Sequence, residues 1–527
     1  MSNPAFYLEA TALRSPDATA VIFRNRHYSY AEIYRWSSRL ASGLAARGYG
    51  KGSRIALSCN NRPAFLIAYY GILMTGAAVV NLLWTSPEND FAYLLEDAGC
   101  DAFLCFDRYG DRDVAPLAIA AAARVPSCRE VIILPEDPEA ASPIPGVPAL
   151  SDLMRGQPDL FTIRHFARHD PALVTYTSGS TSRQKGIEIS AGAVAEAVNL
   201  TIPLFSIEHT AVRLSIFTME CIMTQLFLVL QPTFLGQAVV YLECENAETL
   251  IDEATGGQVW KNIIEHDVTF IVSVPSFYRW LLDHVGTLAK DQIPLKLCIS
   301  GGAALPAAWE KEFRDRLGVD LANGYGASET CAALAWSWPR SGNREGFVGK
   351  MIPGIEARIV DENGQDLPLT SQGHLLVRSP AMMTRYLNRP DLTEKALQDG
   401  WYCTRDIATF DTDGYLKIVG RMDSRISRGN EHILPEEVES LLHRHPAVSL
   451  AAVVEVPHPF HGHDGKAFVT LKSDLKPEQQ IEAATLLQWL KKQLPDGQSP
   501  GELEIRESLP MTNTGKIARH VLAQSAL

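Results

Sequence analysis

The sequence predicts an α/β protein with a large N-terminal domain, residues 1–422, and a small α+β C-terminal domain, residues 423–527. Three observations lead to this prediction. The chain has 527 residues, more than one ordinary hydrophobic core holds, so more than one domain is expected. Strand-like and helix-like apolar segments alternate in the N-terminal part, which is typical of layered α/β structure. From about residue 355, short strands and tight turns indicate a β-rich subdomain.

The clearest N-terminal element is a helix that begins after Ser29. Ser29 and Glu32 have capping-box spacing, and Gly48 supplies a stop signal. Between them, apolar residues recur at helical intervals: Ile33, Trp36, Leu40 and Leu44. A helix is also expected over 64–73, and short apolar strands are expected at 55–57, 77–80, 269–274 and 296–300. This alternation predicts parallel strands that are connected by helices.

The C-terminal third of the chain changes character twice. Asp, Asn and Gly residues, which tolerate positive φ, mark turns at 361–364, 399–400 and 411–414. After Gly420 the pattern is mixed, with helices expected at 435–443 and 481–494 and strands at 453–456 and 468–471. This last segment, about a hundred residues long, is interpreted as a separate small α+β domain.

Composition and charge exclude several function classes. The formal net charge of −13 repels a phosphate backbone, and no run of Lys or Arg offsets it, so a nucleic-acid partner is not expected. No apolar run approaches the roughly 18 residues that span a bilayer, and no charged leader precedes an apolar stretch, so a cytoplasmic protein is expected. The nine cysteines include no C-x-x-C pair, which favours reduced thiols and gives no zinc-site pattern.

A loop rich in hydroxyl groups is the first candidate functional site. It lies between an apolar strand at 172–176 and an alternating strand at 187–189, so it is tied to a sheet. Hydroxyls, glycine-exposed N–H groups and a lysine form a donor set that wraps a polyphosphate. The candidate ligands are Thr177, Ser178, Gly179, Ser180, Thr181 and Lys185. The alternative is a Ser/Thr-rich surface loop, which composition alone favours, and the Walker spacing is not present.

The order of residues in this loop resembles a known family. The adenylate-forming enzymes, which include acyl-CoA synthetases, luciferases and peptide-synthetase adenylation domains, carry T-S-G-[ST]-T-G-x-P-K-G. The resemblance implies that the loop closes on the β- and γ-phosphates of ATP. Two positions depart from the motif, because Ser182 replaces a glycine and Gln184 replaces the proline.

A second signature, Asn323–Thr330, resembles the family's G-Y-G-x-T-E. Alone it looks like half of a dinucleotide fingerprint, but Glu329 stands where the third glycine belongs, so a Rossmann dehydrogenase fits poorly. A structural turn is the other alternative. The resemblance implies that Tyr325 lies against the adenine, that Ser328 contacts the α-phosphate and that Glu329 binds Mg²⁺. The nucleotide ligands predicted from this motif are Asn323, Gly324 and Tyr325.

Two more segments complete the predicted nucleotide site. Residues 301–306 resemble the family's strand-end loop, which would line the adenine and acyl pockets with Gly302, Ala303 and Ala304. Residues 400–406 resemble G-W-x-x-T-G-D, and residues 413–421 resemble D-G-Y-x-x-x-x-G-R. Asp406 can accept hydrogen bonds from both ribose hydroxyls, and Arg421 can reach the same sugar or a phosphate. Arg405 replaces the motif's glycine and would either obstruct the nucleotide or add a phosphate contact.

Two residues near the C-terminus carry a predicted movement and a predicted catalytic step. Asp423 stands at the family's hinge position, where a few dihedral angles would swing the C-terminal domain as a mobile lid. A simple turn aspartate is the alternative. Residues 510–519 resemble P-x-T-x-x-G-K-I-x-R, in which Lys516 would bridge the substrate carboxylate and the α-phosphate. A lone C-terminal lysine is normally solvated, but its place behind three upstream motifs favours catalysis. The predicted catalytic residues are Lys185, Ser328, Glu329 and Lys516.

The sequence leaves the acyl substrate open. The family usually carries L-P-x-x-H, or F-D in amino-acid activators, where this chain has residues 214–221 with neither the histidine nor the aspartate. Glu220 would either bind an amine of the substrate or face water at a helix start, and the second interpretation is slightly favoured. Met219, Met223, Phe277 and Tyr278 would line an apolar or aryl-acid pocket, or belong to the ordinary core.

The thiol acceptor is open as well. Residues 427–433 resemble the lid loop of aryl-acid activating enzymes and aryl-CoA ligases, with Asn430 in place of a glycine that lines the pantetheine tunnel. The leading hypothesis is a ligase that uses ATP and Mg²⁺ to activate a small carboxylic acid and transfers the acyl group to CoA. A standalone enzyme that loads the phosphopantetheine of a separate carrier protein is the alternative. A third hypothesis is a homologue that binds nucleotide or acyl-adenylate without turnover.

Overall fold

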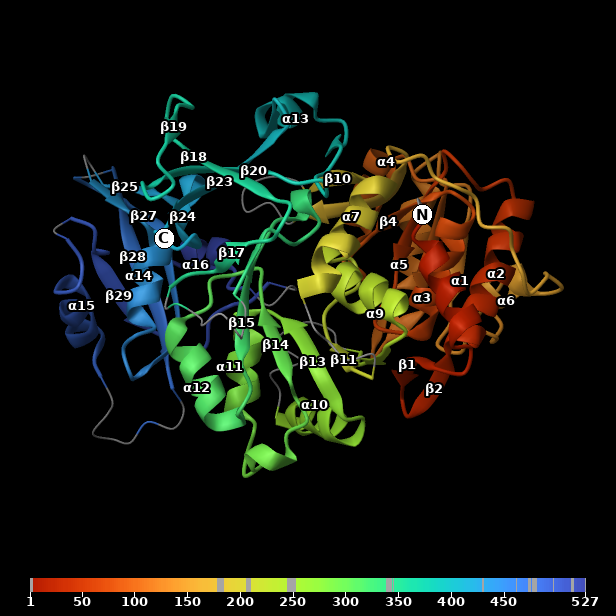
Figure 1. Cartoon of the computed structure of the whole chain (residues 1–527), viewed down its shortest axis with the longest axis horizontal. Helices are drawn as coiled ribbons and strands as arrows, with labels where there is room; N and C mark the ends of the chain where they lie inside the picture. The colour runs from red at the N-terminus through yellow and green to blue at the C-terminus, as the bar shows by residue number, and fades with distance from the viewer. Residues whose placement is uncertain are drawn as a thin grey trace.

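The computed structural model describes most of the chain. The described residues are 3–177, 184–204, 210–243, 253–337, 344, 346–428, 431–460, 462–472, 475, 481–495, 497–512 and 516–526. Figure 1 shows the N-terminal region and the C-terminal region at opposite ends of an elongated molecule, with a central region between them. Three sheets, described next, carry the fold.

The N-terminal region is built on a seven-stranded sheet of described strands, in the order β21-β10-β9-β4-β3-β5-β8. Five strands of this sheet are parallel, in the order β9-β4-β3-β5-β8, and β10 returns antiparallel to β9. The strands are β3 (Arg54–Ser58), β4 (Ala78–Asn81), β5 (Ala102–Phe106), β8 (Val131–Leu134), β9 (Pro171–Thr177), β10 (Lys185–Ser190) and β21 (Arg385–Tyr386). The helices around it are α1 (Ala5–Arg14), α2 (Tyr30–Ala46), α3 (Pro63–Met74), α4 (Glu88–Ala98), α5 (Ala115–Ala123), α6 (Leu150–Met154) and α7 (Ala191–Thr201).

Helix α2 shows how local sequence fixes an element of this region. The Ser29 hydroxyl accepts from the backbone N–H of Glu32 at 3.2 Å, and the Ser29 backbone N–H donates to Oε2 of Glu32 at 2.8 Å. This reciprocal pair is the predicted capping box, and the predicted apolar face of the helix is buried. Helix α3 is buried on every side, as expected of a helix that is apolar all round.

The central region is built on a larger sheet of fifteen described strands. Its first half is parallel across β12, β11, β13, β14 and β15, and its second half is antiparallel from β15 to β24 and beyond. The parallel half comprises β11 (Val212–Ser215), β12 (Ala238–Tyr241), β13 (Val268–Ser273), β14 (Leu297–Ser300) and β15 (Leu321–Tyr325). The antiparallel half includes β16 (Ala335–Trp336), β17 (Gly349–Met351), β18 (Glu356–Val360), β19 (Asp366–Leu367), β20 (Gly373–Arg378), β22 (Leu397–Gln398), β23 (Trp401–Phe410) and β24 (Tyr415–Arg421). The hairpin β1 (Thr19–Phe23) and β2 (Arg26–Ser29) joins the edge at β12.

Helices cover this larger sheet. They are α8 (Ile222–Thr224), the π-helix η2 (Gln225–Leu230), α9 (Gln231–Leu235), α10 (Glu253–Glu265), α11 (Pro275–Asp283), α12 (Ala307–Leu317) and α13 (Pro390–Ala396). A buried cation contacts the π-helix. Arg213 donates from Nη1 to the carbonyl of Phe227 at 2.5 Å, so that carbonyl is bonded to a side chain.

The C-terminal region has its own five-stranded sheet of described strands and its own apolar clusters. The strands are β25 (Ile426–Arg428), β26 (Glu431–Ile433), β27 (Val448–His458), β28 (Gly462–Leu471) and β29 (Glu502–Ile505). The helices are α14 (Pro435–Leu442), α15 (Ala483–Lys491) and α16 (Arg519–Ser525). The short 3-10 helix η5 (Met422–Ser424) connects β24 to this region, and the predicted domain boundary at 422/423 falls in it.

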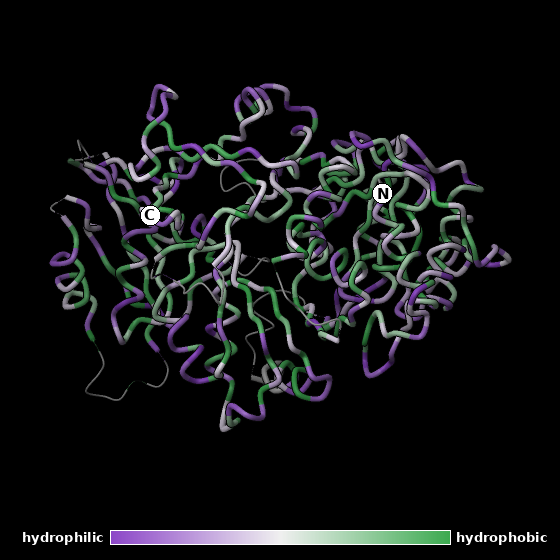
Figure 2. Tube along the Cα trace, viewed as in Figure 1, coloured by the Kyte–Doolittle hydropathy of each residue, from purple (hydrophilic) through white to green (hydrophobic). Residues whose placement is uncertain are grey.

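The distribution of apolar residues agrees with this layering. Figure 2 shows hydrophobic positions along the strands and hydrophilic positions at outer turns such as the β18–β19 hairpin. No helix within the described residues combines the length and the apolar character that crossing a bilayer requires. The predicted mixed α/β architecture, with a β-rich subdomain and a smaller C-terminal domain, is confirmed.

Candidate active site

The phosphate loop is the turn between β9 and β10. Thr177 ends β9, Lys185 begins β10, and the two residues are register partners across the antiparallel pair. Gln184 is held at the loop exit, because its carbonyl accepts from the Tyr93 hydroxyl at 3.1 Å. The other predicted loop ligands lie outside the described residues: Ser178, Gly179, Ser180 and Thr181.

Tyr386 links the phosphate loop to the second signature. The Lys185 Nζ lies 5.6 Å from the centre of the Tyr386 ring, and the Tyr386 hydroxyl donates to Oε1 of Glu329 at 2.7 Å. Burial, reinforced by the Glu329 carboxylate, raises the pKa of Tyr386, which therefore stays a hydrogen-bond donor. The structure thus brings Lys185 and Glu329 to one place. Sequence reasoning missed Tyr386, which stands in no motif and is located only because β21 pairs with β10.

The second signature forms a tight turn beside this group. Ser328 opens a short 3-10 helix, η4 (Ser328–Thr330), and both Ser328 and Glu329 are partly buried. A Cβ at Gly326 would lie 2.1 Å from the carbonyl oxygen of Ala332, so only glycine fits there. Asn323 and Gly324 are in β15, and the Asn323 backbone N–H donates to the Ser337 hydroxyl at 2.6 Å.

A three-residue network lies on the adjoining strands. Asp406 on β23 is the register partner of Arg421 on β24. Arg421 donates from Nε to Oδ1 of Asp406 at 3.0 Å, and the Tyr325 hydroxyl donates to Oδ2 of the same carboxylate. Burial raises the pKa of Asp406, and Arg421 opposes that rise. Three residues predicted from three separate motifs are therefore in direct contact, and both oxygens of the predicted ribose ligand have protein donors.

Lys516 of the C-terminal region reaches the strand-end loop of the central region. A Cβ built on Gly302 would lie 3.5 Å from Cε and 3.8 Å from Nζ of Lys516. Gly302, Ala303 and Ala304 are exposed along this wall, and Lys516 is exposed as well. The surrounding protein atoms still lower the pKa of Lys516, and Arg421 adds to this effect while Cys221 opposes it.

Arg405 contacts the connection between the central and C-terminal regions, which the sequence did not predict, and its effect on the nucleotide stays a prediction. Its backbone has φ of +63°, in the left-handed region that favours glycine, and its guanidinium forms an ion pair with Asp423. Asp423 is in η5, the connection between the central and C-terminal regions. The side chains of Arg405 and Asp423 are 61% and 57% exposed, so the pair lies at the surface.

The segment before α8 holds residues that the sequence predicted for the acyl side of the site. Glu220 is partly buried, and burial raises its pKa to about 7. Glu220 precedes a helix, as the slightly favoured interpretation expected, and it keeps part of its surface exposed to water. Met223 lines the same wall, because its sulfur lies 3.5 Å from where a Cβ on Gly301 would be. The other three pocket candidates, Met219, Phe277 and Tyr278, are buried core residues.

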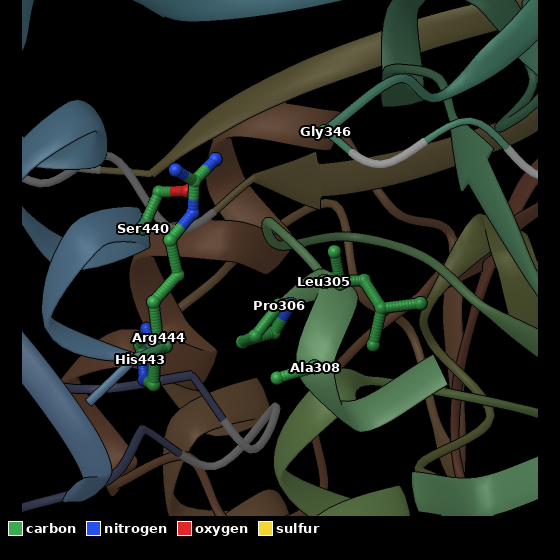
Figure 3. Close-up of a pocket in the computed structure, with 8 residues that line it drawn as sticks. Leu305, Pro306, Ala308, Gly346, Ser440, His443 and Arg444 are labelled. Atoms are coloured by element: carbon green, nitrogen blue, oxygen red, sulfur yellow. The ribbon is translucent and has the colours of Figure 1, made fainter. Parts of the chain in front are cut away.

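A small pocket separate from this site lies where the central and C-terminal regions meet (Figure 3). Its lining comes from the start of α12, from Gly346 and from the end of α14, and includes none of the predicted site residues. Beside it, the rings of Trp309 and His443 are 5.3 Å apart, and Lys472 lies 4.0 Å from Glu312. These contacts hold the C-terminal region against α12.

Glu329 is the candidate metal ligand of the site. Across the described ranges, no three His, Cys, Asp or Glu side chains converge as a metal cluster. Glu329 keeps one carboxylate oxygen outside its bond to Tyr386. A single carboxylate of this kind suits Mg²⁺, which is commonly held by one or two carboxylates together with substrate phosphates.

Comparison with family models decides the classification. The model described as AMP-binding enzyme matches residues 8–387, and the model described as AMP-binding enzyme C-terminal domain matches residues 437–516. The chain belongs to the AMP-binding enzyme family.

Known AMP-binding enzymes are similar over the whole chain. A feruloyl-CoA synthase from Amycolatopsis sp is 30% identical, and the match covers 96% of this chain and 96% of that protein. A long-chain-fatty-acid–CoA ligase from Bacillus subtilis is 28% identical, over 98% and 93% of the two chains. A 3-hydroxybenzoate/4-hydroxybenzoate–CoA ligase from Thauera aromatica is 27% identical, over 96% and 93%.

Solved structures share the fold. An anthranilate CoA ligase in complex with anthranoyl-AMP has a TM-score of 0.89 and 23% identity, over 99% of this chain and 97% of that one. A benzoate CoA ligase from Burkholderia xenovorans has a TM-score of 0.85 and 24% identity, over 99% of each. At these identities the likeness establishes the fold alone.

Family membership fixes the reaction class. This AMP-binding enzyme is an ATP-dependent, AMP-forming acid–thiol ligase that activates a carboxylic acid as an acyl-adenylate. The structure brings together the predicted residues Lys185, Glu329, Tyr325, Asp406 and Arg421, with Lys516 against Gly302. The roles assigned to single residues remain predictions.

Proposed function

We propose that this AMP-binding enzyme joins an aryl carboxylic acid to CoA through an acyl-adenylate. The position of Lys516 against Gly302 carries the proposal, because this cation of the C-terminal region lies beside the loop that was predicted to line the adenine and acyl pockets. Similar proteins named for ferulate and hydroxybenzoate support an aryl acid, and their names support CoA as the acceptor.

The acyl wall also supports an aryl acid over a fatty acid. A long alkyl chain requires a continuous apolar tunnel, and a partly buried carboxylate such as Glu220 would be costly beside it. The polar group suits a ring that carries its own polar substituent. A fatty-acid substrate is the runner-up, because a similar protein is a long-chain-fatty-acid–CoA ligase.

ATP would bind across the walls described above. Lys185 and the phosphate loop would hold the β- and γ-phosphates, and Asn323 and Tyr325 would hold the adenine. Asp406 would accept from the ribose hydroxyls while Arg421 keeps it ionised, since their contact favours the charged carboxylate.

Mg²⁺ would be held by Glu329 together with phosphate oxygens. When bound, it would neutralise charge on the phosphates that the substrate carboxylate has to approach. The Tyr386 hydroxyl, which donates to Glu329, would orient that carboxylate toward the ion.

In the first half-reaction, a carboxylate oxygen of the acid attacks the α-phosphorus, and pyrophosphate leaves. Two anions must meet, so the barrier is largely electrostatic repulsion. Lys516 would bridge the attacking oxygen and an α-phosphate oxygen, and the Ser328 hydroxyl would donate to the same phosphate.

In the second half-reaction, the CoA thiolate attacks the carbonyl carbon, and AMP leaves with its electron pair. The proposed hinge at Asp423 would first turn the C-terminal region, which removes Lys516 and admits the thiol. The ion pair of Asp423 with Arg405 would favour the adenylate-forming pose described here.

Acid-dependent ATP–pyrophosphate exchange tests the first half-reaction. The panel should hold aryl, fatty and amino acids, and Lys516→Ala is the catalytic control. Exchange with aryl acids that is lost in the variant would support the proposal. Exchange with fatty acids alone would refute the aryl-acid substrate class. If no acid of the panel supports exchange although ATP still binds, a non-catalytic homologue is favoured.

The acceptor needs a separate measurement. Thioester formation is followed with the acid that gives the strongest exchange, with either CoA or a phosphopantetheine-bearing carrier protein as the thiol. Turnover with free CoA would support a CoA ligase. Turnover with the carrier alone would favour the standalone loading enzyme.

A further inference from the structure

The acyl wall holds one ionisable group that the proposed reaction does not use. Glu220 is partly buried between the end of β11 and the start of α8. The Thr218 hydroxyl donates to its Oε1 at 2.6 Å. Within the part of the chain that the structure describes, no ion pair involves Glu220. A carboxylate that is partly withdrawn from water normally has a cation or several donors as partners, whereas Glu220 has the Thr218 hydroxyl and its own backbone N–H and no cation among the described residues.

The backbone of Glu220 is fixed from two sides. Its carbonyl accepts from the Thr175 hydroxyl at 3.1 Å and from Nε2 of Gln225 at 3.1 Å. Gln225 is itself oriented, because the Tyr69 hydroxyl lies 3.5 Å from its Oε1. Glu220 is therefore part of a rigid wall and not of an adaptable loop, which is the arrangement that selective binding requires.

Neighbouring contacts place this wall along the path of the acyl group. Met223 reaches Gly301, and Lys516 reaches the next residue, Gly302. Burial raises the pKa of the thiol of Cys221, the residue after Glu220, and the nearby Lys516 ammonium opposes that rise. If Lys516 holds the substrate carboxylate, as in the proposed function, the rest of the acid extends along this wall past Glu220.

We propose that Glu220 selects acids whose acyl part carries a hydrogen-bond donor, an amino group or a hydroxyl. The inference rests on the proposed function, since it uses Lys516 as the carboxylate site. A donor on the substrate would supply the partner that the carboxylate lacks. An analogue without the donor would cover that carboxylate without giving it a partner, and a site of this kind discriminates against such analogues.

The first test needs no mutation. Pyrophosphate exchange is measured for matched acids: 4-hydroxycinnamate against 4-methoxycinnamate and cinnamate, and 3-aminobenzoate against 3-methylbenzoate and benzoate. The donor-bearing member of at least one set should have a kcat/KM at least about tenfold above both others. The hydroxyl and amino sets separate the two possible donors. Equal kcat/KM values within every set would overturn the inference.

Variants then connect the preference to Glu220. Glu220→Gln keeps the shape and one acceptor oxygen, so the ratio between donor and methoxy acids should fall severalfold. Glu220→Leu removes the acceptor, so the ratio should fall to about one or below. Glu362→Gln, in an exposed turn, is the matched control and should keep the wild-type ratio. An unchanged ratio in Glu220→Gln would overturn the inference even if the leucine variant fails to fold.

The outcomes separate this inference from the proposed function. Exchange with aryl acids that ignores the donor would overturn the inference and leave the aryl-acid ligase standing. Exchange limited to fatty acids would overturn both.

Discussion

Two carboxylates of the candidate site differ in their surroundings: Asp406, on the predicted nucleotide side, is buried, and Glu220, on the predicted acyl side, is partly buried. Asp406 has donors on both oxygens, Arg421 and Tyr325, whereas Glu220 has the hydroxyl of Thr218 as its side-chain partner. The difference follows from the ligands. Under the proposed function the nucleotide side binds ATP whichever acid is activated, so its carboxylate can be completed by protein groups. The acyl half faces a substrate that varies, and its missing partner has to come from that substrate.

The largest effect is expected from removing Lys516, which tests whether the nucleotide side and the acyl side depend on one shared cation. Lys516→Ala should lower acid-dependent exchange by about 10²- to 10³-fold, as the loss of one preorganised donor does elsewhere. ATP binding should change little, because Lys516 contacts the strand-end loop and is outside the Asp406 network. Rapid-quench measurement of adenylate formation checks the prediction. The matched control is Lys492→Ala, an exposed lysine of the C-terminal region, which should keep wild-type rates.

The pH dependence of stability sharpens the contrast on the acyl side. The folded-state pKa of Glu220 is raised to about 7 from 4.5, so its neutral form is favoured in the fold. The resulting stabilisation is complete below pH 4.5 and is lost as pH rises through 7. Glutamine does not titrate, so the Glu220→Gln variant does not lose this stabilisation. Between pH 4.5 and 8, its free energy of unfolding should rise relative to that of the wild type by up to about 3 kcal/mol.

Urea unfolding of both proteins at several pH values measures this difference. Comparing the pair cancels other groups that titrate in the same range, notably Glu439, whose pKa burial also raises to about 7. A difference that stays constant with pH would show that Glu220 is solvated like an ordinary surface carboxylate.

Tyr386→Phe tests the nucleotide side at a residue outside all the motifs. The change removes the hydrogen bond to Glu329 and keeps the ring beneath Lys185. A net loss of about 1 kcal/mol is expected, which corresponds to a fivefold to tenfold higher Mg²⁺ requirement for exchange. Titration of exchange with Mg²⁺ measures it. The same requirement in variant and wild type would separate Tyr386 from the metal.

The smallest effect is expected at the connection between the two regions. Arg405→Gly relieves the left-handed backbone, worth about 1 kcal/mol, and removes an exposed ion pair with Asp423, worth about 0–1 kcal/mol. Overall stability should therefore change little, while thioester formation should accelerate about twofold to fivefold because one contact of the present pose is lost.

Single-turnover measurement of each half-reaction separates these effects. A large gain in both half-reactions would instead mean that Arg405 hinders catalysis. A loss in adenylate formation would give Arg405 a direct role with the nucleotide.

Local sequence was sufficient for much of the fold. The capping box at Ser29 and Glu32, the apolar strands before Pro275 and Gly301, and the Asp-Gly turns each depend on neighbours a few residues away, and each is present. The same holds for the motifs, since their spacing places Asp406 opposite Arg421 through one hairpin turn. The contact of Tyr325 with this pair joins two motifs 81 residues apart, which the resemblance implied only as a shared nucleotide site.

Tertiary structure alone decided the remaining features. Tyr386 lies beneath Lys185 because β21 pairs with β10 across about 200 residues of chain, which no local pattern records. Arg405 meets Asp423 because two strands and a connecting turn bring them together. The backbone of Glu220 is held in place because Thr175 and Gln225, from other elements, donate to its carbonyl. The sequence by itself determined the features that adjacent residues and family motifs encode. Side-chain burial and long-range strand pairing depend on where distant segments of the chain meet, and only the folded chain sets that.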